Sequence, residues 1–260
     1  MTLKVDSREG FWSLCVLALA VLVTPLALYV FRFYAPFATD QNIWSDFGQY
    51  YGGVTSPALS ALAFVALVAT LNLQRKQIDD TDRRSQLVDF ESTLRYYLEA
   101  LRDILNAIDL HHSETGAVTA QGADVFRVYY RGRLAAIFRK TRGANPNLDE
   151  REIVRRSFDE LYRKYGANFG HYFRTLYRAI LYVHTSCPPK ADRKHYVGLI
   201  TCRLSRYEIL LLAYNCLGSI GERKFKKLVE DYHLLEYIDP EDMISYDHLM
   251  FYDPKAMIGD

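Results

Sequence analysis

The sequence lacks the motifs by which common enzyme and metal-binding classes are recognised. It contains no glycine-rich phosphate loop, no HExxH motif, no nucleophile elbow, no zinc finger and no carboxylate pair typical of metal-dependent nucleases. Its four cysteines show no CxxC spacing. We therefore expect free thiols, no metal site, no cofactor and no catalytic residues, and we predict that the protein is not an enzyme.

Charged side chains are absent from two long stretches near the N-terminus, residues 11–31 and 54–71. About 20 apolar residues in a helix, at ~1.5 Å rise each, cross a hydrocarbon core of ~30 Å. Because a helix satisfies its own backbone hydrogen bonds in lipid, we predict a transmembrane hairpin over residues 1–77, with spans at about 11–33 and 50–73. Neither stretch contains Asp, Glu, Lys, Arg or His, so we do not expect a proton relay or a transporter of charged substrates.

Basic residues flank the predicted hairpin but avoid its linker. The linker, roughly residues 33–47, contains Asp40 and Asp46 but neither lysine nor arginine. The basic residues before the first span and after the second are Lys4, Arg8, Arg75, Lys76, Arg83 and Arg84. Since basic residues beside spans stay in the cytoplasm, both termini are predicted to be cytoplasmic. A cleaved signal peptide is the alternative for the first stretch, but its apolar run exceeds the usual length of roughly 7 to 15 residues.

Small residues recur every four positions where the second span begins, at Gly48, Gly52, Ser56 and Ser60. If this segment is helical, the spacing places them on one smooth ribbon where another helix can approach closely. Two different helices could pack on this ribbon. One is the first span of the same hairpin, and the other is a second copy of the chain in a homo-oligomer.

The remaining chain, residues 78–260, carries helical patterns. Apolar residues recur three and four apart on one stripe of an amphipathic helix: Leu87, Phe90, Leu94, Leu98, Leu101, Leu105 and Ile108. Asn147 and Glu150 have the spacing of a capping box and are predicted to open a helix that ends at Gly166. The predicted fold class is all-α, an N-terminal two-helix transmembrane hairpin followed by a helical cytoplasmic domain.

A second capping box precedes the most apolar run of this domain. Ser205 and Glu208 stand immediately before residues 209–217, and Gly218 follows the run. Read as helix caps, Ser205 and Glu208 are explained without catalysis. Asn215 lies inside the run, and a buried amide requires a hydrogen-bond partner. We therefore expect Asn215 to anchor a helix contact.

Residues 125–142 form the densest basic segment of the chain, with aromatic residues interleaved. The basic cluster consists of Arg127, Arg131, Arg133, Arg139, Lys140 and Arg142. Such a cluster can bind the phosphates of a nucleic acid, dock on anionic lipid headgroups, or form a solvated face that pairs with acids elsewhere. Acidic residues dominate after residue 230, so pairing between this tail and the cluster is a further expectation.

Several segments together resemble a known family: FGQYYGG before the second span, DFESTLRYYL, HYFRTLYRAILYV and LSRYEILLLAYNCLG. Their order is similar to that in the phage abortive infection protein family, from about residue 47 to 235. The most specific positions are His171, Tyr172, Phe173, Arg174, Leu176 and Tyr177, then Leu204, Ser205, Glu208, Ile209, Leu210, Tyr214 and Asn215. The resemblance implies an antiviral role in which an infected cell is arrested or killed. It transfers no catalytic residue.

The two-span arrangement is also similar to that of membrane effectors encoded beside bacterial retrons. This similarity implies a bacterial inner-membrane location and a partner consisting of a reverse transcriptase with RNA-linked DNA. The leading hypothesis is an effector that permeabilises the lipid bilayer when its hairpins associate. The alternatives are a membrane-tethered nuclease or other enzyme, and a non-enzymatic scaffold that recruits a separate toxin.

Overall fold

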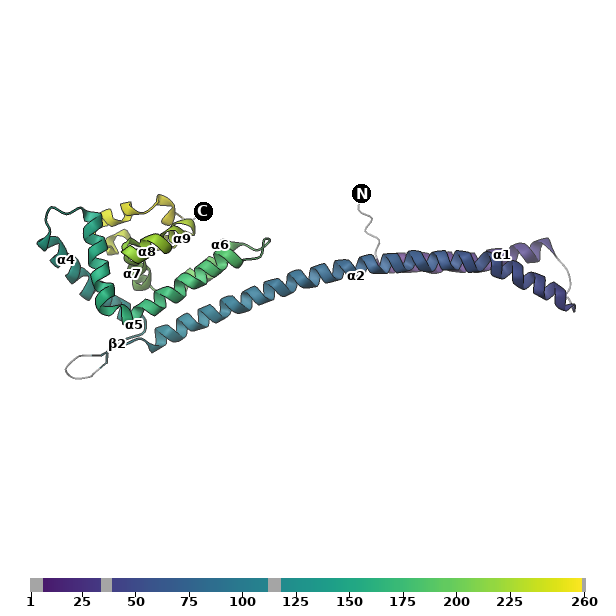
Figure 1. The fold of residues 1–260 in the computed structure, drawn as a ribbon, viewed down its shortest axis with the longest axis horizontal. Coiled ribbons are helices and arrows are strands. Elements are labelled where there is room, and N and C mark those ends of the chain that lie inside the picture. Colours follow the sequence, from purple (N-terminus) through teal and green to yellow (C-terminus); the bar gives the residue numbers. More distant parts are fainter. Residues whose placement is uncertain (1–6, 34–38, 112–117, 259–260) are drawn as a thin grey trace. The chain divides into compact units, whose positions relative to one another are not determined.

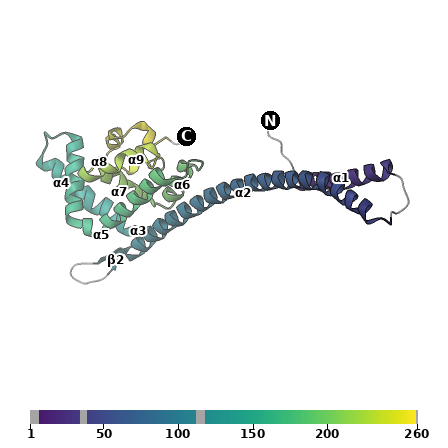
Figure 2. The same cartoon turned by 45° about the vertical axis from the view of Figure 1, so that its right-hand side comes forward.

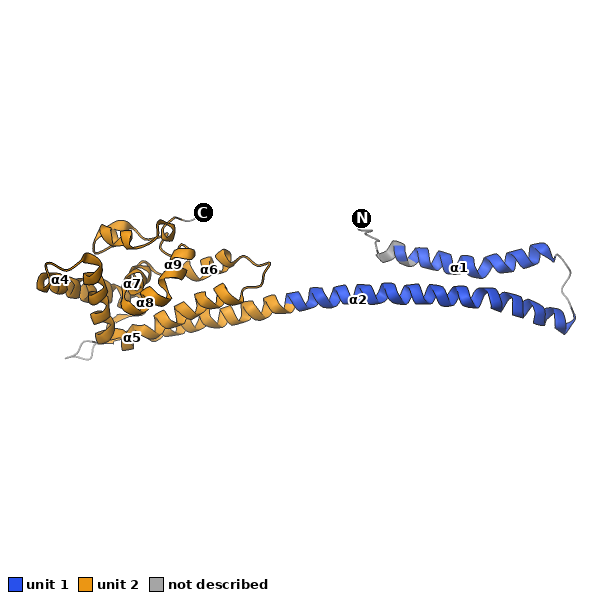
Figure 3. Ribbon diagram, turned by 45° about the horizontal axis from the view of Figure 1, so that its top comes forward, with its two compact units in different colours: residues 1–84 blue, residues 85–260 orange. Residues whose placement is uncertain are grey.

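Helices make up nearly all of the protein in a computed structural model, which describes residues 7–33, 39–111 and 118–258 (Figure 1). This confirms the predicted all-α class. The exception within the described residues is a short antiparallel pair of strands, β1 (Asp109–His111) and β2 (Val118–Gln121). The chain divides into two compact units, Met1–Arg84 and Ser85–Asp260, called here the hairpin unit and the helical domain (Figure 3).

The hairpin unit contains α1 (Ser7–Arg32) and the first part of α2 (Gln41–Ala107). Both helices are long and apolar enough to cross a membrane. Helix α2 begins at Gln41, so the second half of the predicted linker is helical. Asp40 explains the early start, because its carboxylate accepts a hydrogen bond from the Asn42 amide at 3.0 Å and so caps the first turn. Lys4 of the predicted flanking residues lies outside the described part of the chain.

From residue 85 onward, α2 belongs to the helical domain, where its predicted apolar stripe is buried. Phe90, Leu94 and Leu101 are all less than 10% exposed. The Phe90 ring stacks on that of Tyr182, with centroids 5.3 Å apart. The stripe prediction is therefore confirmed, although Leu87, Leu98 and Leu105 are only half-buried and α2 ends at Ala107, one residue before Ile108. Beyond β2, Gly122 has a φ of 56°, a left-handed conformation that glycine adopts without strain.

The rest of the helical domain is a series of helices and short turns. They are α3 (Ala123–Arg127), the π-helical segment η1 (Val128–Leu134), α4 (Ala135–Ala144), α5 (Glu150–Ser186), α6 (Arg193–Thr201), α7 (Arg206–Leu217), α8 (Ser219–Lys224) and α9 (Lys226–Asp231), then the 3-10 turns η2 (Pro240–Asp242), η3 (Tyr246–Phe251) and η4 (Pro254–Ala256).

Helix α7 is the centre of this domain. Every residue from Glu208 to Leu217 is buried, as expected for a helix that is apolar on all sides. Helices α3, α5 and α8 pack against it (Figure 2). The predicted capping is seen at its start, where the Ser205 amide donates to the Glu208 carboxylate at 2.8 Å, and the helix ends before Gly218 as expected.

The predicted limits of α5 are wrong at both ends. Asp149 is the N-cap, because its carboxylate accepts from the Arg151 amide at 3.1 Å, and Asn147 lies outside the helix. The helix continues through Gly166 to Ser186. A glycine inside a helix costs only about 1 kcal/mol, which burial of the apolar face beyond it outweighs. Here the Tyr162 ring lies over Gly166, 3.1 Å from where a Cβ would stand.

Candidate functional site

The small-residue ribbon of Gly48, Gly52, Ser56 and Ser60 lies on α2 and is exposed along its whole length in the hairpin unit. A Cβ placed on Gly48 or Gly52 would meet no atom within 4 Å. The Ser60 hydroxyl donates to the Ser56 carbonyl at 2.8 Å, so it is satisfied within its own helix. The ribbon is therefore a smooth, uncovered surface.

The first helix packs on a neighbouring face of α2. Thr55 is buried there, and the Tyr51 hydroxyl donates to the Leu22 carbonyl of α1 at 3.1 Å. The rings of Tyr29 and Phe47 meet edge to face, with centroids 4.7 Å apart. Of the two occupants that the sequence leaves open, α1 does not cover Gly48 or Gly52.

The basic cluster of residues 127–142 spans α3, η1 and α4, and all of its members are exposed. Arg131 donates to the Tyr207 hydroxyl at 2.9 Å and pairs with Asp242 at 3.4 Å. Arg142 pairs with Glu150. These two arginines are therefore engaged with other parts of the domain.

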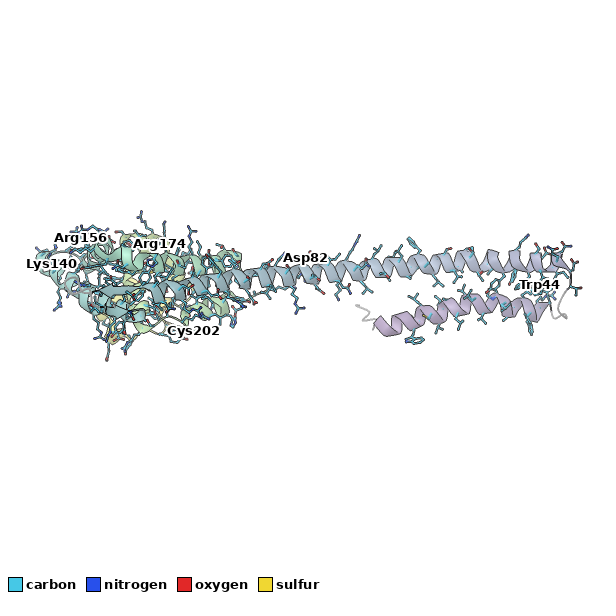
Figure 4. All side chains as sticks on the ribbon, turned by 90° about the horizontal axis from the view of Figure 1, so that it is seen from below. Trp44, Asp82, Lys140, Arg156, Arg174 and Cys202 are labelled. Carbon is cyan, nitrogen blue, oxygen red and sulfur yellow. The ribbon has the colours of Figure 1, made fainter. Side chains whose placement is uncertain are left out.

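The other members of the basic cluster have local partners or none. Arg127 pairs with Asp124 at 3.6 Å, and Arg139 donates to the Ala135 carbonyl at 3.3 Å. The Arg133 guanidinium lies 5.3 Å from the centroid of the Tyr165 ring. Across the described ranges, Arg133, Arg139 and Lys140 form no ion pair, and Lys140 lies at the surface of the helical domain (Figure 4). The cluster is thus a solvated face in which part of the positive charge is unpaired.

Asp242 is the acid of the tail that pairs with the basic cluster. The sequence alone did not distinguish it from the other acidic residues of the tail. Its side chain is 6% exposed and pairs with both Arg131 and Arg206. Its backbone carbonyl accepts from the Tyr130 hydroxyl at 2.7 Å. The expected contact between tail and cluster therefore exists within one chain, through a single buried carboxylate.

His248 lies at the centre of a second tail contact, which sequence analysis missed. It is fully buried, with Nε2 2.8 Å from the Glu150 carboxylate and Nδ1 2.6 Å from the Tyr214 hydroxyl. The Tyr214 oxygen accepts from the Ile244 amide at 3.0 Å. A neutral imidazole that donates from Nε2 to Glu150 and accepts at Nδ1 from the Tyr214 hydroxyl satisfies all of these contacts. Glu150 and His248 are too far apart in sequence for any local pattern to connect them.

The stability of the domain is expected to depend on the protonation of His248. Burial lowers the pKa of His248 below its usual 6.5, although hydrogen bonding to Glu150 opposes the shift and Arg142 reinforces it. Because the unfolded chain then binds the proton more readily, the free energy of unfolding falls as the pH drops below about 6.5. Thermal unfolding of the full chain in detergent between pH 7.5 and 5.5 measures this loss.

His248→Gln is expected to weaken this pH dependence, whereas His195→Gln, at an exposed position of α6, is the matched control and leaves it unchanged. Equal pH slopes for wild type and His248→Gln would contradict the assignment.

The residues on which the family resemblance rests serve mainly to build the core. Tyr172 donates a hydrogen bond to Glu208, whose side chain is 2% exposed. Burial, with the nearby Glu208 carboxylate, raises the Tyr172 pKa, so the phenol stays protonated. Tyr214 holds His248 as described. No group of three or more His, Cys, Asp or Glu side chains that could hold a metal ion occurs among the residues described.

Comparison with family models gives one finding that bears on function. The model described as "Putative phage abortive infection protein" matches residues 164–243, a narrower range than the resemblance from about 47 to 235. Comparisons with curated proteins and with solved structures gave no match. The matched range includes α6, α7, α8 and α9 and ends just after Asp242. Over these residues, fewer than half of the chain, the resemblance is confirmed: this segment is similar to the phage abortive infection protein family, whose description points to anti-phage defence.

Proposed function

We propose that this protein is a membrane-anchored effector of phage defence that causes abortive infection by permeabilising the bacterial inner membrane. The uncovered ribbon on α2 is the observation that carries this proposal. In lipid, helices associate through close van der Waals packing, which small residues permit. Since α1 leaves Gly48 and Gly52 open, the ribbon is available to α2 of a second copy.

The proposed orientation places both termini in the cytoplasm. Basic residues follow the second span at Arg75, Lys76, Arg83 and Arg84, and all are exposed on α2. Trp44, near the turn of the hairpin, suits the opposite membrane interface (Figure 4). With this orientation the helical domain is cytoplasmic and can respond to phage infection.

A nucleic-acid-containing partner is part of the same proposal. Arg133, Arg139 and Lys140 are the members of the basic cluster without an ion pair in the described chain, so their charge is available to phosphates. A reverse transcriptase with RNA-linked DNA would supply such phosphates and would restrain the effector until phage interferes with it. The protein itself would perform no catalysis.

Membrane potential and dye uptake, followed together in induced cells with and without phage, test the proposal. We expect depolarisation and dye entry before any loss of cellular DNA or RNA. Intact potential with degraded nucleic acid would contradict the proposal and favour a tethered nuclease. Harmless overexpression of the chain alone, with killing restored by a neighbouring gene, would favour a scaffold that recruits a separate toxin.

A further inference from the structure

A cavity of about 520 Å³ opens in the helical domain between α5 and the corner where α7 meets α8, mostly within the family-matching range. Its volume lies within the range of roughly 300–1,000 Å³ typical of small-molecule sites. Gly218 and Gly221 form part of its wall. A Cβ on Gly221 would lie 2.0 Å from the Asn215 carbonyl oxygen, so this corner requires a glycine.

The cavity has an excess of positive charge. Arg163, Arg174, Arg178 and Lys224 line it, and all four are exposed. None of the four forms an ion pair in the part of the chain that the structure describes, and Arg174 donates only to the Tyr162 hydroxyl, at 3.3 Å. Arg174 and Arg178 are one turn apart on α5, about 6 Å along its axis, whereas Arg163 lies about three turns before Arg174. Unpaired cations that line one cavity favour an anionic ligand, and phosphate groups match arginine geometry especially well.

The single acidic residue of the lining does not cancel this charge. One Asp159 oxygen accepts from the Ser219 amide at 2.9 Å, and the other accepts from the Ser219 hydroxyl. Arg155, which is not part of the lining, lies 4.0 Å from the second oxygen. Asp159 thus holds the start of α8 in place, and Arg155, which pairs mainly with Glu152, offsets only part of its charge. The lining still carries more positive than negative charge, with four basic residues against one acid.

Asn215 provides a second, independent observation. It lines the cavity, is only 9% exposed, and its side-chain amide forms no hydrogen bond within the described ranges. Its amide atoms remain accessible to solvent, because among the described residues the buried side-chain polar atom without a partner is Ser205 Oγ. The amide therefore offers both a donor and an acceptor to a ligand in the cavity. The expected helix-anchoring contact of Asn215 is therefore absent from its side chain, which is available to a ligand instead.

The remaining walls are aromatic. Tyr162 and Tyr177 of α5 line the cavity and are half-buried, so part of each ring is accessible. Phe158, Phe173 and Phe225 lie behind them and are at most 3% exposed. Aromatic rings supply large flat surfaces on which a planar ligand group can stack. Cations bind phosphates, aromatic rings stack on the face of a base, and an amide can hydrogen-bond to the edge of a base. The cavity contains all three kinds of group.

We infer that this cavity binds a nucleotide, with its phosphates on Arg174, Arg178 and Lys224 and the edge of its base read by the Asn215 amide. This site goes beyond the proposed function, because it gives the helical domain a small-molecule ligand whatever the hairpin does. It is also separate from the basic cluster of residues 127–142, none of which lines the cavity.

Calorimetric titration of the purified full chain in detergent with ATP, GTP, CTP and UTP tests the inference, with inorganic tripolyphosphate as a base-free probe. We expect at least one nucleotide to bind at least tenfold more tightly than tripolyphosphate. Arg178→Glu and Lys224→Glu, at exposed positions, are each expected to weaken nucleotide binding at least tenfold. Lys190→Glu, also exposed and outside the lining, is the matched control and leaves binding unchanged.

Asn215→Asp replaces the donor with a negative charge at nearly constant size. It is expected to weaken nucleotide binding more than tripolyphosphate binding, since only the nucleotide carries a base. Near-ultraviolet circular dichroism of each variant shows that the domain is folded. The inference is overturned if no nucleotide binds at millimolar concentration, if tripolyphosphate binds as tightly as every nucleotide, or if folded Arg178→Glu and Lys224→Glu bind like wild type.

Discussion

Gly52→Leu is expected to abolish phage-dependent killing and dye uptake while leaving the amount of protein in the membrane unchanged. Gly52 lies at the middle of the small-residue ribbon, and nothing stands within 4 Å of an added Cβ. A leucine is therefore accommodated in the isolated hairpin but would hold a second α2 away from the ribbon. Crosslinking of α2 between copies, measured in membranes, should fall together with killing.

Ala61→Leu provides the matched control for this substitution. Ala61 is exposed on α2, and at 3.6 residues per turn it lies about half a turn around the helix from Gly52. The same kind of enlargement there should leave killing and crosslinking intact. If Gly52→Leu cells die as fast as wild type after phage infection, the ribbon has no part in the activity.

Gly221→Ala is expected to destabilise the helical domain by about 3 kcal/mol or more. The new Cβ would lie 2.0 Å from the Asn215 carbonyl oxygen and 2.6 Å from its carbonyl carbon. These are backbone atoms of the buried helix α7, so they cannot rotate away as a side chain can. Thermal unfolding, followed by near-ultraviolet circular dichroism of the tyrosines, should show a Tm lower by roughly 6–12 °C for a domain of this size.

Gly198→Ala separates this steric effect from the general effect of replacing a glycine. Gly198 is exposed within α6, and an added Cβ there meets nothing within 4 Å. The alanine should raise the free energy of unfolding by about 0.5–1 kcal/mol, because it restricts the unfolded chain and favours the helix. A Gly221→Ala protein as stable as wild type would show that the corner between α7 and α8 tolerates a side chain.

The features that sequence analysis predicted well depend on residues close together in the chain. The apolar stripe through Phe90, Leu94 and Leu101 is visible because its members recur with the period of a helix. The start of α7 is visible because Ser205 and Glu208 lie three positions apart. The same local reasoning chose Asn147 in place of Asp149 as the N-cap of α5. Both are good capping residues, and only the observed start of the helix at Glu150 distinguishes them.

Local patterns failed where a contact joins distant segments. Gly166 was expected to end a helix, but the burial of Phe169 and Leu176 against the core holds the helix together across it. Asp242 is one acid among many in the tail until Arg131 and Arg206 are placed beside it. No spacing rule identifies such a residue, because its environment comes from three separate elements.

The sequence by itself determined the all-helical class, the two charge-free helices and the small residues spaced four apart, because each is a property of consecutive turns of one helix. Only the tertiary structure decided which face of α2 is covered by α1, which cations of residues 127–142 are paired, and that Asn215 lines the same cavity as Arg174, Arg178 and Lys224. Those outcomes depend on how several helices pack together, and the free energy of such packing is shared among residues far apart in the chain.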